Sequence, residues 1–178
     1  MSHDGDSHEL LLLGLLTWES MHGYRLHEFL EHRLHFVTNL KRATAYRLLE
    51  TLRRRGLVDG ETEREGRRPE RLVYRLTSDG RKRFETLLRA QISQSHSAVD
   101  PSNVALLFLD ALPPAERVVG LSERRRHVED DRQSLDALIQ AHPASSPARL
   151  VLERELIHHD AEMQWLDRAI ATLGEAGC

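Results

Sequence analysis

The chain has almost none of the features that stabilise or anchor proteins outside the cell interior. Its single cysteine, Cys178, is the last of 178 residues, so no internal disulfide can form and a reducing compartment is expected. The apolar run from Leu10 to Leu16 is interrupted by Gly14 and is far shorter than the roughly 20 residues of a membrane-spanning helix. The polar first residues do not form a signal peptide. We therefore expect a cytoplasmic protein with no membrane partner.

Motifs of enzyme active sites are also missing. The sequence has no glycine-rich phosphate-binding loop, no GxSxG nucleophile elbow and no nucleophile with an evident partner. The acidic run at 129–131 lies among arginines within an expected helix, and we interpret it as a solvated face. We predict neither a catalytic site nor a resident metal or cofactor.

What the chain does have is an uneven distribution of charge. Its net charge is −3, yet the segment 41–89 carries 15 Lys and Arg against 8 Asp and Glu, a surplus of +7. Residues 1–95 carry a net +3 and residues 96–178 a net −6. A basic segment inside an acidic chain predicts a surface for a polyanion, and nucleic acid is the first candidate.

Hydrophobic periodicity in the first half predicts the order of elements of a winged helix-turn-helix domain. Thr38 or Asn39 would cap the third helix, and Ser78 or Asp79 the fourth. The predicted elements are helices over 8–19, 24–36 and 39–56, a two-stranded hairpin from 57 to 77 with its turn at 65–66, and a helix over 78–95.

Beyond Asp100–Pro101 the sequence has helical signals only, over 103–112, 115–141 and 147–173. In the last helix, apolar side chains and one histidine follow the heptad spacing of a coiled coil. This seam consists of Leu152, Leu156, His159, Met163, Leu166, Ile170 and Leu173. Because one amphipathic helix needs a partner to cover it, the seam predicts a homodimer. We expect an all-α fold with a small β-wing, with a DNA-binding domain over 1–95 and a C-terminal helical dimerisation domain over 101–178.

Side chains for DNA lie on the third helix and the hairpin. A recognition helix enters the major groove with its N-terminal residues foremost, and an arginine there can bind guanine bidentately. Wing arginines reach the minor groove or the backbone, whereas we interpret the run 53–55 as a solvated face. The predicted DNA-binding residues are Tyr24, Lys41, Arg42, Ala43, Thr44, Tyr46 and Arg47 with Arg64, Arg67, Arg68 and Arg71 of the wing.

Three motifs resemble those of the PadR family of transcriptional regulators. His22-Gly23-Tyr24 is similar to the family's HGY, residues 44–49 (TAYRLL) to its recognition-helix core, and residues 73–77 (VYRLT) to its second wing strand. The runs at 106–116 and 161–170 resemble the C-terminal region of the longer, virulence-activator-like members. The resemblance implies a winged-helix homodimer that binds DNA, a repressor more readily than an activator, and a small aromatic effector that Trp165 would contact.

Alternatives remain at two places. His158 and His159, with Glu155 and Glu162 one turn away on either side, have the spacing of a metal half-site, although His159 is also explained as a polar seam residue that sets register. The function we expect is sequence-specific DNA binding by a homodimer on an inverted-repeat operator. The rival functions are a winged-helix adaptor that binds an acidic protein and a metal-responsive regulator.

Overall fold

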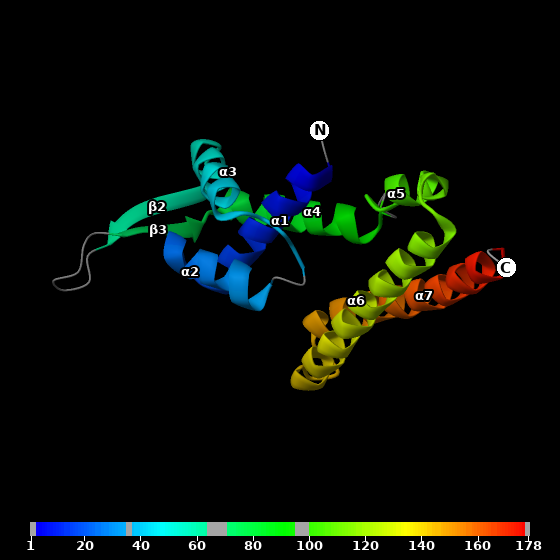
Figure 1. Ribbon diagram of the computed structural model, residues 1–178. Coiled ribbons are helices and arrows are strands. Elements are labelled where there is room, and N and C mark those ends of the chain that lie inside the picture. Colours follow the sequence, from blue (N-terminus) through cyan, green and yellow to red (C-terminus); the bar gives the residue numbers. More distant parts are fainter. Residues whose placement is uncertain (1–2, 35–36, 64–70, 95–99, 177–178) are drawn as a thin grey trace. The chain divides into compact units, whose positions relative to one another are not determined.

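The structure is a computed structural model that describes residues 3–34, 37–63, 71–94 and 100–176 (Figure 1). These residues form two compact units, one up to Gln94 and one from Asp100 onward. No helix within the described ranges is long and apolar enough to cross a membrane.

The first unit consists of helices and one small sheet. The predicted second helix over 24–36 is α2 followed directly by a π-helical turn that ends at Arg33; Leu34 is not helical, and residues 35 and 36 lie outside the described residues. The elements are α1 (His3–Trp18), β1 (Met21–His22), α2 (Gly23–Glu28), the π-helix η1 (Phe29–Arg33), α3 (Arg42–Arg54), β2 (Val58–Glu63), β3 (Arg71–Leu76) and α4 (Ser78–Ile92).

The sheet has three antiparallel strands in the order β1-β3-β2, where the sequence predicted a two-stranded hairpin. Gly60 of β2 lies opposite Tyr74 of β3, and Met21 of β1 lies opposite the same tyrosine on its other side. A two-residue strand is too short to produce an alternating pattern, which is why the sequence did not reveal β1. As a result, the residues before α2 are hydrogen-bonded to the wing.

The core of this unit surrounds α1, which packs against α3, α4 and β3. Leu12, Leu13 and Leu15 of α1 are buried, as are Leu49 and Leu52 of α3. A central helix must be apolar on several sides because neighbours cover it on several sides. This agrees with the apolar stretch near the start of the chain.

The ends of α3 and α4 show which caps the chain uses. Gly56 has φ of +70° and ends α3, since its N–H and that of Leu57 donate to carbonyls of the last helical turn. At the other end, α3 begins only after Lys41, with no side-chain cap, so the prediction of Thr38 or Asn39 was wrong. For α4 the cap is Thr77, whose hydroxyl accepts from the Gly80 N–H, and not Ser78 or Asp79.

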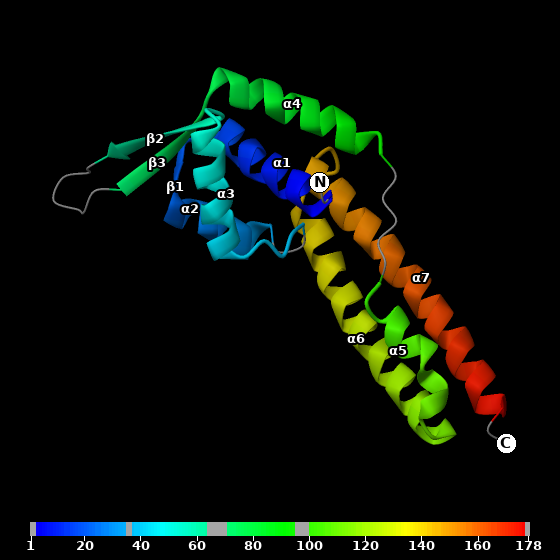
Figure 2. The same cartoon turned by 90° about the horizontal axis from the view of Figure 1, so that it is seen from above.

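The second unit is a pair of long helices preceded by two short turns. Figures 1 and 2 both show α6 (Pro114–Ala141) and α7 (Pro147–Ala176) side by side, after α5 (Asn103–Leu107) and the 3₁₀ turn η2 (Leu109–Ala111). The buried side chains of this unit are Leu121, Leu135, Ile139, Leu152 and Leu166.

Ion pairs supplement the thin core between α6 and α7. Three arginines of α6 bind carboxylates of α7, with Nε–oxygen distances of 2.5 to 2.7 Å. The pairs are Arg124–Glu162, Arg125–Asp167 and Arg132–Asp160.

The helix α6 covers part of the heptad seam of α7, which the sequence analysis expected a second subunit to cover. Leu152 and Leu166 are 0% exposed within the single chain, because α6 packs along α7. For these two residues the premise of an uncovered seam was wrong. Leu156, His159 and Met163 are half-buried, and their role in a dimer stays a prediction.

Candidate nucleic-acid interface

The helix α3 has one apolar and one polar face, as its sequence predicted. Ala45, Leu49 and Leu52 recur at helical spacing and are buried, so the opposite side of the helix faces outward. Ala43 and Arg47 lie on that outward side and are exposed. The side chain at position 47 therefore projects from a helix whose orientation is set by its packed face.

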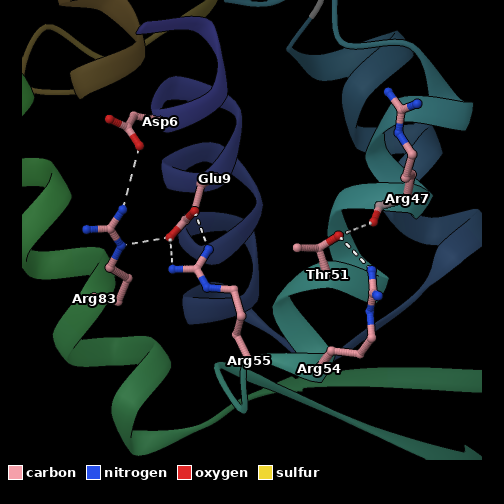
Figure 3. Close-up of polar contacts among 7 residues, drawn as sticks. All are labelled: Asp6, Glu9, Arg47, Thr51, Arg54, Arg55 and Arg83. Carbon is pink, nitrogen blue, oxygen red and sulfur yellow. Dashed lines mark hydrogen bonds and ion pairs between the residues drawn. The ribbon is translucent and has the colours of Figure 1, made fainter. Parts of the chain in front are cut away.

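The guanidinium of Arg47 has no partner among the described residues. Figure 3 shows its guanidinium extending away from Thr51 and Arg54, and it forms no ion pair or side-chain hydrogen bond with any described residue. The Thr51 hydroxyl donates to the Arg47 carbonyl at 3.0 Å, which engages the backbone only. All five guanidinium donors of Arg47 are thus available to a ligand.

The neighbouring arginines are engaged to different degrees. Arg53 forms a bidentate pair with Glu50 on the helix surface at 2.9 and 3.0 Å. Arg54 donates a long bond of 3.4 Å to the Thr51 hydroxyl. Arg55 is also exposed, but it binds Glu9 of α1, a partner that the interpretation of 53–55 as a solvated face did not include.

Glu9 is a buried carboxylate that joins three helices (Figure 3). Arg55, which follows α3, donates to it at 2.7 and 3.3 Å, and Arg83 of α4 donates at 2.7 Å. Burial alone would raise the pKa of Glu9, but the hydrogen bonds and charges of the two arginines together outweigh it and lower the pKa. Glu9 is therefore ionised at neutral pH and links the end of α3 to α1 and α4.

The residues at the start of α3 also face solvent. Lys41 and Arg42 are exposed, and Thr44 is half-exposed. The Arg42 guanidinium lies 5.5 Å from the centre of the Tyr46 ring, a cation–π distance. The two cations and Arg47 thus surround the exposed N-terminal part of α3.

Only part of the predicted wing surface lies in the described ranges. Arg71 is exposed on β3 and has no ion pair with a described residue. The predicted turn at 65–66 and Arg64, Arg67 and Arg68 lie outside the described residues.

A hollow of about 460 Å³ lies between the start of α2, one flank of α3 and β3. It contains all three tyrosines of the chain, Tyr24, Tyr46 and Tyr74. The other lining residues are His22, Gly23, Arg71 and Leu72. The sequence predicted Tyr24, Tyr46 and Arg71 as binding residues but missed His22 and Tyr74, because a histidine is an unusual helix cap and Tyr74 has the pattern of a core residue of a strand.

Gly23 allows the Tyr46 ring to pack closely against the start of α2. A Cβ atom at position 23 would come within 2.3 Å of the Tyr46 ring, far inside van der Waals contact. The HGY motif and the tyrosine of the TAYRLL motif are therefore packed against each other, although 22 positions separate Tyr24 from Tyr46.

The second unit contains the other candidate site residues. Trp165 is 37% exposed, with the Arg124 guanidinium 5.9 Å from its ring centre. A hollow of about 210 Å³ is lined by Arg124, Val128, His158, His159 and Glu162.

The same side chains limit the metal hypothesis. Glu162 binds Arg124, and His159 Nδ1 donates to the Glu155 carbonyl at 2.8 Å. Among the residues that the structure describes, no group of three or more His, Cys, Asp or Glu side chains is placed to hold a metal ion.

Comparison with known families identifies both units. Residues 12–86 match the Transcriptional regulator PadR-like family, and residues 100–174 match the Virulence activator alpha C-term family. The chain belongs to the PadR-like family. The resemblance inferred from the HGY, TAYRLL and VYRLT motifs is confirmed, as is the virulence-activator type of the C-terminal region.

Solved PadR-like structures share this fold. Bacillus subtilis PadR in complex with operator DNA superposes with a TM-score of 0.80 at 21% identity, over 93% of this chain and 98% of that chain. The same regulator with p-coumaric acid gives 0.75 at 18%, over 98% and 99%. The Vibrio cholerae virulence activator AphA gives 0.72 at 20%, over 95% and 99%. No curated protein sequence matches the chain significantly.

Proposed function

We propose that the protein binds duplex DNA in a sequence-specific manner as a homodimer and represses transcription from an inverted-repeat operator. The observation that carries this proposal is the outward face of α3, where Arg47 is exposed and unpaired among the described residues beside Lys41 and Arg42. A helix of this kind fits the major groove, and an arginine can read guanine with two hydrogen bonds.

The dimer would present two copies of α3 to one face of the duplex. Successive major grooves on that face are about 34 Å apart, so an operator with two-fold symmetry is expected. The C-terminal unit, with α6 and α7, would set this spacing. The PadR complex with operator DNA, in a protein of the same fold, supports the assignment of DNA as the ligand.

An effector is a second part of the proposal. A small aromatic acid would bind in the C-terminal unit beside Trp165 and Arg124, whose indole and guanidinium suit a planar anion. Such a ligand would release DNA by favouring a subunit spacing that does not match the two half-sites. The PadR structure with p-coumaric acid supports an aromatic acid as the class of ligand.

Selection of bound fragments from genomic or random DNA by the purified protein tests the function. We expect an enriched inverted repeat and an affinity that falls steeply with salt, because bound phosphates release counterions. Arg47→Ala should lose sequence preference, whereas Arg71→Ala should weaken binding evenly across sequences.

The matched control is Arg89→Ala. Arg89 is an exposed arginine of α4 that pairs with Glu85, and its loss should leave the selection unchanged. Equal behaviour of the Arg47 and Arg89 variants would contradict the proposal, as would absence of binding to any duplex at low salt.

A further inference from the structure

The hollow beside α3 contains a histidine whose two ring nitrogens have separate environments. His22 Nδ1 accepts a hydrogen bond of 3.1 Å from the Arg25 N–H and so caps α2. A nitrogen that accepts carries no proton, so in the neutral ring the proton is on Nε2. The cap thus makes the other end of the imidazole a hydrogen-bond donor.

The remaining polar groups of the hollow are donors or cations as well. Tyr24 is 67% exposed, Tyr46 is half-exposed and Arg71 is exposed. Burial, with Tyr46 and Glu50 nearby, raises the pKa of the Tyr74 phenol, so that this group stays neutral. No carboxylate is among the described lining residues.

The position of the hollow suggests what fills it. Tyr46 and Arg42 lie on one flank of α3, next to the outward face that carries Arg47. When a helix occupies the major groove, the phosphate backbone runs along its flanks, and phosphates receive hydrogen bonds from Arg, Tyr and other polar side chains. A hollow lined by donors on that flank therefore meets backbone and not base edges.

We infer that this hollow seats one phosphate of the DNA backbone, and that His22 donates to it from Nε2 while Nδ1 holds the start of α2. Tyr24, Tyr46 and Arg71 supply the further donors. This inference rests on the proposed DNA-binding function. It adds His22 as a residue that positions the duplex against α3.

Two substitutions distinguish the capping role of His22 Nδ1 from the proposed phosphate contact of Nε2. Asparagine places its amide near Nδ1 and is among the best helix caps, but it does not reach the position of Nε2. Glutamine extends to the position of Nε2 and supplies an N–H there. His22→Asn should keep the thermal midpoint and weaken binding to a mixed-sequence duplex about tenfold. His22→Gln should lower the midpoint and bind more tightly than His22→Asn.

A phosphate-specific measurement completes the test. Single phosphates of a bound duplex are replaced by neutral methylphosphonates, one position at a time, and the affinities of the wild type and His22→Asn are compared. At one position, the methylphosphonate should weaken DNA binding by the wild type but should not weaken binding by His22→Asn any further. Wild-type affinity in His22→Asn, or equal losses at every position in both proteins, would overturn the inference.

Failure of the proposed phosphate contact can be distinguished from failure of the proposed DNA-binding function. If the wild type binds DNA and Arg47→Ala loses sequence preference while His22→Asn is unchanged, the phosphate seat is wrong and the function stands. If the wild type binds no duplex, the proposed function itself fails.

Discussion

The two units of this chain solve the problem of stability in different ways. In the N-terminal unit, helices surround α1 on several sides and bury a continuous core from α1, α2, α3, β2, β3 and α4. In the C-terminal unit only five apolar side chains are buried among the described residues, and Val104, Leu107 and Phe108 are at least 64% exposed. Apolar area removed from water is the main source of stability, so the first unit has the larger hydrophobic core, and the second has apolar surface left to cover.

The difference agrees with the functions proposed for the two units. A recognition helix must be held rigidly, because bidentate contacts with base edges tolerate little displacement. A unit that mediates association needs exposed apolar surface. The following predictions test this contrast, from the largest expected effect to the smallest.

Core truncation should affect the N-terminal unit most. Leu52→Ala removes a side chain that is 0% exposed and should cost about 2–5 kcal/mol of stability. Each unit has one of the two tryptophans, so unfolding in a Trp165→Phe background reports the first unit through Trp18. The control Val119→Ala lies in α6 of the second unit and is followed through Trp165 in a Trp18→Phe background. Its side chain is 57% exposed, so the substitution should change the stability of that unit by less than about 0.5 kcal/mol. Similar costs for both variants would refute the contrast.

Removing the Glu9 charge should have the next largest effect. Glu9→Gln leaves Arg55 and Arg83 without their carboxylate and should cost about 1–3 kcal/mol at neutral pH. Because the pKa of Glu9 is lowered in the folded state from 4.5, its contribution is present above that value and is lost as the pH falls through the folded pKa. The stability difference between wild type and variant should therefore shrink in acid.

The matched control for Glu9 is Glu50→Gln, which breaks an exposed pair with Arg53 and should change the thermal midpoint much less. A difference between the wild type and Glu9→Gln that stays constant down to strongly acidic pH would show that the charge of Glu9 is not what stabilises this unit.

Association should depend on the exposed apolar side chains of the C-terminal unit. Phe108→Ser should weaken the proposed homodimer by more than about 1 kcal/mol, as for an aromatic anchor in an interface. His159→Leu should hold or tighten the dimer, because it replaces the polar residue of the seam. Sedimentation velocity over a range of concentrations measures both. A monomeric His159→Leu protein would exclude the seam as a register device.

The smallest effect is expected from the ion pairs between α6 and α7. Arg132→Ala removes the bonds to Asp160 and Asp136, which are partly solvated and screened by salt. The second unit, followed through Trp165 in a Trp18→Phe background, should melt slightly lower at low salt, and the difference should shrink at high salt. A large, salt-independent loss would mean that these pairs and not the leucines hold the hairpin.

Much of the fold was predictable because its signals are local. Ala45, Leu49 and Leu52 mark the inward face of α3 by spacing alone, and Gly56 marks its end. Pro113 and Pro147 mark the starts of the two long helices, and the three short motifs are enough to indicate PadR-like membership. Each of these signals depends on residues within a few positions of one another.

The predictions that failed depend on contacts between distant positions. The sequence placed Arg55 on a solvated face and did not reveal its bond to Glu9, 46 positions earlier. It left the α7 seam uncovered, whereas α6 buries Leu152 and Leu166. It contained no sign that Met21–His22 would join β3. The local sequence of a short segment does not specify which distant side chain will contact it.

The order of helices, the cationic face of α3 and the family are therefore all specified by the linear sequence. Which cations remain free is settled by tertiary packing, since pairing of Arg55 and exposure of Arg47 depend on where α1 lies. Packing also brings His22 and all three tyrosines to one hollow. Periodicity and charge are properties of the chain taken in order, whereas a binding site is a property of distances in space.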